Sequence, residues 1–114
     1  MPNNKYDLEE RCAVFAENVI ELVKAKPATH INRPIISQLI RSSSSIGANY
    51  CEADGAESKK DFRHKIAICK KESRETRYWL RLLAKTNPDA KEKCRVLWQE
   101  AHEFLLIFSA ILRK

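Results

Sequence analysis

The chain has 114 residues, of which 32% are charged and two are glycine, and its formal net charge at pH 7 is +6. This length allows one domain with one core, and a composition rich in Ala, Leu, Ile, Lys, Arg and Glu excludes a β-rich protein. No apolar stretch approaches the roughly 20 residues that span a bilayer, and residues 1–11 lack the apolar core of a signal peptide, so we expect a cytoplasmic protein.

The first helix is predicted over about residues 6–26. Apolar residues recur there at spacings of three and four, which is typical of one face of an amphipathic helix. They are Leu8, Cys12, Phe15, Val19, Leu22 and Val23. Pro27 follows and is expected to end the helix, because proline lacks the N–H that a helix interior requires.

The second helix is predicted over about residues 34–53. Pro34 suits the first helical position, where its missing N–H costs nothing. A spacing of three and four continues from Ile36 to Tyr50, straight through the four serines at positions 42–45. These serines are therefore predicted to lie inside a helix, although serine and glycine are common in loops.

The last two helices are predicted over about residues 58–86 and 88–113. Ser58 with Asp61 resembles a capping box, in which the serine side chain accepts a hydrogen bond from the backbone N–H three residues later. Asn87, followed by a proline and an aspartate, is expected to cap the fourth helix.

The connections between these four helices are short, which favours antiparallel neighbours. The fold is therefore predicted to be all-α, an up-down antiparallel four-helix bundle that forms a single domain over residues 1–114.

The small residues of the second helix point to a close helix–helix contact. Ser43, Gly47 and Cys51 are four residues apart, and a glycine costs a helix about 1 kcal/mol relative to alanine, so tight packing must offset it. A polar row runs beside them, formed by Arg41, Ser45, Asn49 and Glu52. It is either solvated surface or a hydrogen-bond network with a neighbouring helix or subunit. We assign these residues to self-assembly or to a structural network: Arg41, Ser43, Gly47, Asn49, Glu52 and Glu75.

No catalytic, cofactor or metal site is predicted. The serines lack a GxSxG elbow, and a hydroxyl inside a regular helix is not presented as a nucleophile. A di-iron bundle needs two Glu-x-x-His pairs, whereas only Asp61-x-x-His64 is similar. The cysteines at 12, 51, 69 and 94 form no close pair for zinc, so we expect four small, buried, reduced thiols.

Positive charge is concentrated on the third helix. Residues 59–85 contain ten Lys or Arg and three Asp or Glu, a net charge of +7, so the rest of the chain sums to −1. Such a surface favours phosphate binding, and RNA or DNA is the predicted ligand. A protein partner or simple solvation would also fit. The candidate nucleic-acid-binding residues are Lys59, Lys60, Arg63, Lys70, Arg74, Arg77 and Arg81.

Two passages, RSSSSIGANYCEA from Arg41 and SKKDFRHKIAICKKESRETRYWLRLL from Ser58, resemble the bacterial four-helix-bundle family named after 23S rRNA intervening-sequence proteins. That family is related to the accessory variability proteins of diversity-generating retroelements. The resemblance implies a homo-oligomeric ring, a pentamer, with no established enzymatic activity. It also implies nucleic acid and a reverse transcriptase as candidate partners.

Overall fold

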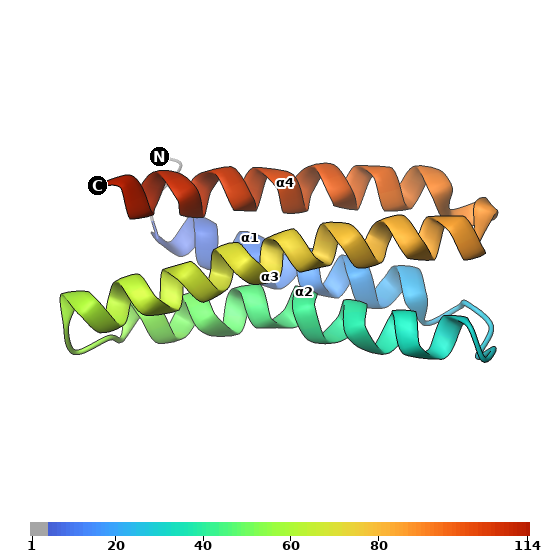
Figure 1. Ribbon diagram of the computed structural model, residues 1–114, viewed down its shortest axis with the longest axis horizontal. Helices are drawn as coiled ribbons and strands as arrows, with labels where there is room; N and C mark the ends of the chain where they lie inside the picture. The colour runs from blue at the N-terminus through green and yellow to red at the C-terminus, as the bar shows by residue number, and fades with distance from the viewer. Residues whose placement is uncertain (1–4) are drawn as a thin grey trace.

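The computed structural model describes the backbone of residues 5–114 and the side chains from residue 8 onward, and these residues form four α-helices and one 3-10 turn. The helices are α1 (Lys5–Val23), α2 (Asn32–Asp54), α3 (Lys59–Thr86) and α4 (Lys91–Arg113), and the 3-10 turn η1 (Pro88–Ala90) precedes α4. Figure 1 shows the four helices side by side along the longest axis of the molecule. The predicted all-α four-helix bundle is confirmed.

Two helix boundaries on α1 and α2 differ from the prediction. α1 ends three residues early, at Val23, and the chain turns there with the Lys26 N–H donating to the Val23 carbonyl over 3.0 Å. α2 begins two residues before Pro34, because Thr29 accepts hydrogen bonds from both the Asn32 and the Arg33 backbone N–H groups, each at 3.0 Å. Pro34 still lies in the first turn, where its missing N–H is harmless.

At the start of α3 the predicted cap is confirmed, since the Ser58 hydroxyl accepts a hydrogen bond from the Asp61 N–H over 3.0 Å. The predicted Asn87 cap of α4 is wrong. The residues after Asn87 form η1, and its side chain bonds to Asn32 of α2 instead of to the next helix.

This Asn87 side chain belongs to a buried polar cluster that ties the two loops at one end of the bundle together. The carboxamides of Asn32 and Asn87 exchange hydrogen bonds of 3.1 and 3.0 Å, and Thr86 Oγ1 donates to Asn32 Oδ1 over 3.0 Å. Asn32 also donates to the Pro27 carbonyl over 3.0 Å. Buried polar groups must find partners, and the competition from Asn32 explains why Asn87 does not cap α4.

The core fills the space between the four apolar stripes. Phe15 of α1 meets Phe104 of α4 edge to face with ring centroids 5.3 Å apart, and Phe108 stacks on Phe104 one turn later. Three of the four cysteine thiols are buried in this core, as predicted, but Cys51 is exposed. The expectation of four buried thiols is therefore wrong at that position.

The helices do not contact one another equally. α1 packs on α2, α2 on α3 and α3 on α4 along their lengths, whereas α1 and α4 contact each other much less. A groove of about 410 Å³ lies between α1 and α4, lined partly by Val14, Val96 and Leu97. Because α3 contacts only its two neighbours extensively, its third face is open to solvent.

Candidate nucleic-acid interface

The exposed face of α3 carries a row of cations that we call the basic stripe. Its members are Lys60, Lys71, Arg74, Arg81 and Lys85. All five side chains are exposed, and their spacing sets them opposite the apolar stripe that begins at Ile66 and ends at Leu83. Among the described residues, none of the five takes part in an ion pair. These charges are therefore available to a ligand.

Two further candidates lie at the borders of this face. Lys59 is exposed in the first turn of α3, and Lys70 is half-buried in the middle of the helix. Neither takes part in an ion pair within the part of the chain that the structure describes. They flank the basic stripe without belonging to its most exposed line.

Arg63 and Arg77 face α4 and have partners within the chain. Arg63 Nη2 donates to the Leu112 carbonyl over 2.8 Å, at a helix end where carbonyls lack partners inside the helix. The Arg77 guanidinium lies 5.1 Å above the Trp98 ring, and its Nη1 is 3.0 Å from His102 Nδ1. Both arginines therefore stabilise the contact between α3 and α4, and they do not belong to the basic stripe.

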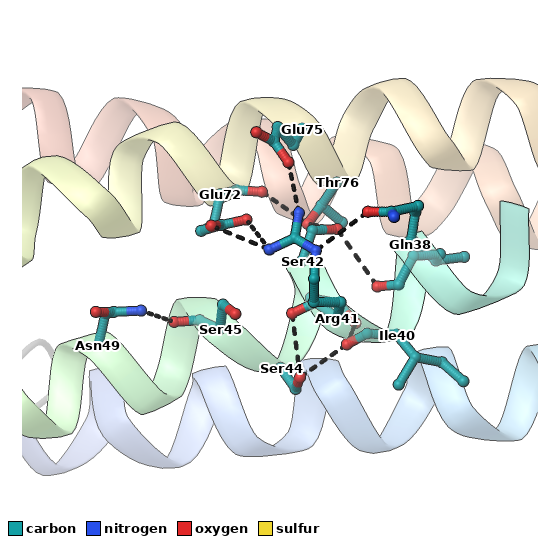
Figure 2. Close-up of polar contacts among 12 residues, drawn as sticks. Gln38, Ile40, Arg41, Ser42, Ser44, Ser45, Asn49, Glu72, Glu75 and Thr76 are labelled. Carbon is teal, nitrogen blue, oxygen red and sulfur yellow. Dashed lines mark hydrogen bonds and ion pairs between the residues drawn. The ribbon is translucent and has the colours of Figure 1, made fainter. Parts of the chain in front are cut away.

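A polar network joins α2 to α3, as Figure 2 shows. The Arg41 guanidinium is 2.7 Å from Glu75 Oε1 and 3.3 Å from Glu72 Oε2, and it also donates to Gln38 over 3.1 Å. Only 6% of Glu72 is exposed. We call Arg41 with its two carboxylates, Glu72 and Glu75, the Arg41 clamp.

Beneath this clamp two buried hydroxyls bridge the same helices. Thr76 Oγ1 is 3.0 Å from Ser42 Oγ and donates to the Glu72 carbonyl over 2.8 Å. Sequence reasoning missed Glu72, Ser42 and Thr76 as members of the network. The only signal was that polar residues occupied positions in or beside the apolar stripes of two helices.

The other members of the polar row contact different partners. Glu52 Oε1 is 2.7 Å from Lys65 Nζ, a second ion pair between α2 and α3. The Asn49 side chain donates to the Ser45 carbonyl of its own helix over 2.9 Å and forms no bond to α3. Arg41 and Glu52 of the polar row thus bond to α3 within the chain. Asn49 bonds only to its own helix.

The small residues of α2 face α1 of the same chain. A Cβ atom at Gly47 would lie 3.1 Å from the Cys12 Cβ, which is tighter than ordinary van der Waals contact. Ser43, one turn before Gly47, is buried. The close helix contact expected at Gly47 is therefore made within the chain, whereas Ser44, Ala48 and Cys51 stay exposed beside it.

The described residues contain neither a group of metal ligands nor a membrane-spanning helix. No three His, Cys, Asp or Glu side chains from residue 8 onward are grouped as metal ligands would be. Within the same part of the chain, each helix is too short or too polar to cross a membrane.

The family model of the 23S rRNA-intervening sequence protein matches residues 4–110, nearly the whole chain. The chain belongs to this family. A search of the curated proteins found no match.

Among solved structures, this chain is similar to a protein of unknown function of the S23 ribosomal protein family from Bacteroides thetaiotaomicron VPI-5482, determined at 1.70 Å. The two chains share 30% sequence identity with a TM-score of 0.82, over 96% of this chain and 98% of the other. The resemblance to the family of 23S rRNA intervening-sequence proteins is confirmed. Neither the family description nor that of the solved structure names an enzymatic activity.

Proposed function

We propose that this chain is a non-catalytic helical bundle that binds RNA or DNA through the basic stripe of α3. The observation that supports it is the basic stripe, a line of five exposed cations that have no acidic partner among the described residues. From Lys60 to Lys85 the stripe spans roughly 38 Å of helix, close to the ~34 Å of one duplex turn. Cations on such a line neutralise several phosphates and release their counterions.

Binding of labelled structured RNA and of duplex DNA across a salt series tests this proposal. The test variant carries Lys60, Lys71, Arg74 and Arg81 changed to glutamine. The matched control removes the same charge from exposed positions outside α3, with Lys24, Arg33, Lys91 and Lys93 changed to glutamine. The two variants have equal net charge. A difference in their affinity for nucleic acid therefore shows that the position of the charges on α3 matters, and not only the total charge.

We expect the wild type and the control to bind near physiological salt, about 150 mM, with similar slopes of log K against log salt. The test variant should bind more weakly, with a slope smaller by roughly 0.7–0.9 for each lost phosphate contact. If both variants lose the same affinity, or if the wild type binds only at salt concentrations far below about 150 mM, the binding is generic charge attraction. Either result would overturn the proposal.

A protein is the second candidate partner for the same face, because a row of unpaired cations also fits an acidic protein surface. A reverse transcriptase would be such a partner if the resemblance to retroelement accessory proteins extends to this chain. Co-purification that depends on the basic stripe, in a protein that binds neither RNA nor DNA, would favour this alternative.

We also infer that the chain self-associates in the cytoplasm as a ring of five copies, as the family resemblance implies. Repetition of one basic stripe around a ring would multiply the positive potential and the number of phosphates contacted at once. Because Gly47 of α2 packs on α1 within the chain, the assembly surface is expected among the apolar side chains left exposed on α1 and α4.

A further inference from the structure

Tyr78 is an aromatic side chain set in the middle of the basic stripe. It lies one helical turn after Arg74 and one before Arg81, and 55% of it is exposed. Among the described residues, the other large hydrophobic side chains that are exposed are all aliphatic. They are Val14, Ile20, Ile31, Ile40, Val96 and Leu106.

Among the cations that the structure describes, none covers a face of this tyrosine ring. Arg11 lies over Phe104 and Arg77 over Trp98, each with its guanidinium carbon 5.1 Å from the ring centroid. In the part of the chain that the structure describes, no such contact forms at Tyr78, although it has an arginine one turn away on either side.

The ring is nevertheless held in place. Tyr78 meets the half-buried Trp79 edge to face, with ring centroids 5.1 Å apart and an angle of 73° between the planes. Trp79 in turn packs against the hydrophobic core. A regular helix anchored by its neighbours thus presents an aromatic surface to solvent, between two cations that are roughly 10 Å apart along the axis.

We propose that Tyr78 stacks on an unpaired base of a single-stranded nucleic acid while Arg74 and Arg81 contact the phosphates on either side. This inference rests on the proposed function and narrows its ligand. In a duplex each base is already stacked on its neighbours, and the deep, narrow major groove of A-form RNA does not admit side chains. Base–aromatic stacking between cations is the mode by which single strands are bound without sequence readout.

The experiment compares one labelled RNA strand that has no internal complementarity with the same strand paired to its complement. The proteins are the wild type, Tyr78→Ala, Tyr78→Leu and Tyr78→Phe. Leucine retains apolar contact with Trp79 but cannot stack, whereas phenylalanine retains the ring. The mass in solution and the thermal unfolding midpoint of each variant are measured alongside.

We expect Tyr78→Ala and Tyr78→Leu to weaken single-strand binding by about fivefold or more, because stacking on one base accounts for at least that factor. Tyr78→Phe should bind like the wild type. Duplex affinity and the salt slope should stay unchanged in all four proteins, since the phosphate contacts remain.

Other outcomes separate this inference from the proposed function. Suppose that the wild type binds both RNAs. If the alanine and leucine variants then lose affinity equally for the single strand and the duplex, or lose affinity for neither, stacking by Tyr78 is overturned, whereas binding through the basic stripe is not. If the variants change the mass of the protein in solution, Tyr78 belongs to an interface between copies and the inference is also overturned. If the wild type binds no nucleic acid, both proposals fail.

Discussion

At the scale of single residues, Gly47 shows how one missing carbon atom fixes a helix contact. α1 and α2 approach so closely there that an added Cβ would lie 3.1 Å from the Cys12 Cβ. The same stretch of sequence would also have suited contact with another subunit. Only the position of α1 decided that the contact is within the chain.

We predict that Gly47→Leu destabilises the folded chain by about 1–3 kcal/mol, the usual cost of forcing extra atoms into a packed contact. The free energy of unfolding from urea titration measures it. Ala48→Leu, at the next position of the same helix, is the control, because Ala48 is exposed and should tolerate the change. Equal stability of the two variants would show that α1 does not lie against Gly47.

The four thiols differ in reactivity because they differ in burial. Burial raises the pKa of Cys12 and of Cys69 to about 12 and that of Cys94 to about 11, so almost no thiolate exists there near neutral pH. Partial burial, with the Glu9 and Asp54 carboxylates nearby, raises the pKa of Cys51 as well, but this thiol is accessible.

We therefore predict that a thiol reagent at pH 8 modifies one cysteine of the native protein quickly and all four after denaturation. Mass spectrometry of digested protein should place the fast site at Cys51, and Cys51→Ser should abolish it. The rate should keep rising as the pH is raised beyond 9, because a raised pKa delays formation of the thiolate. Fast modification of Cys12 or Cys69 in native protein would contradict the packing described.

At the scale of elements, α3 has three faces with different roles. One side reaches α2 through the Arg41 clamp, another reaches α4 through Arg63 and Arg77, and the third carries the basic stripe. A charged residue on this helix can therefore have a structural role or a surface role according to its angle around the axis. Net charge alone does not distinguish them.

The Arg41 clamp gives a test at this scale. Arg41→Met should destabilise the chain by about 2 kcal/mol, because it leaves the buried Glu72 carboxylate without its cation. Glu72→Met should cost less, since Arg41 is half exposed and keeps its bond to Glu75. The double variant should be more stable than Arg41→Met alone.

Urea unfolding of the three variants, with Lys65→Met as a control that breaks only the outer Glu52 pair, measures these differences. Additive losses in the double variant would show that Arg41 and Glu72 are not coupled.

At the scale of the whole molecule, the basic stripe and the groove between α1 and α4 lie on different faces. The solvent face of α3 is basic, whereas Val14 of α1 and Val96 of α4 line the groove between those two helices and stay 40% and 54% exposed. This separation allows copies to associate through one region while the basic stripe stays free.

We predict that the purified protein has a solution mass well above the 13.2 kDa of one chain, that of five copies if the ring forms. Light scattering measures the mass directly. Val96→Glu should lower it by placing a charge beside Val14 and Leu97 in the groove between α1 and α4, whereas Gln99→Glu adds the same charge at another exposed site of α4 and should not. A wild type that has the mass of one chain at micromolar concentration would contradict self-association.

The sequence by itself determined the helices and the fold class, because both follow from local rules. Apolar residues spaced three and four apart, a serine cap at Ser58, and prolines near the first and third turns act within a few residues of the chain. The placement of the serines 42–45 inside α2 could be predicted for the same reason.

Tertiary structure decided which polar residues are free to bind. Asn87 bonds to Asn32 instead of capping α4, Arg77 stacks on Trp98, and Glu72 is buried beside Arg41. Each of these depends on residues at least 21 positions away in the chain, so no local spacing reveals them. The same packing left Tyr78 and the basic stripe exposed, because α3 has neighbours on only two of its three sides.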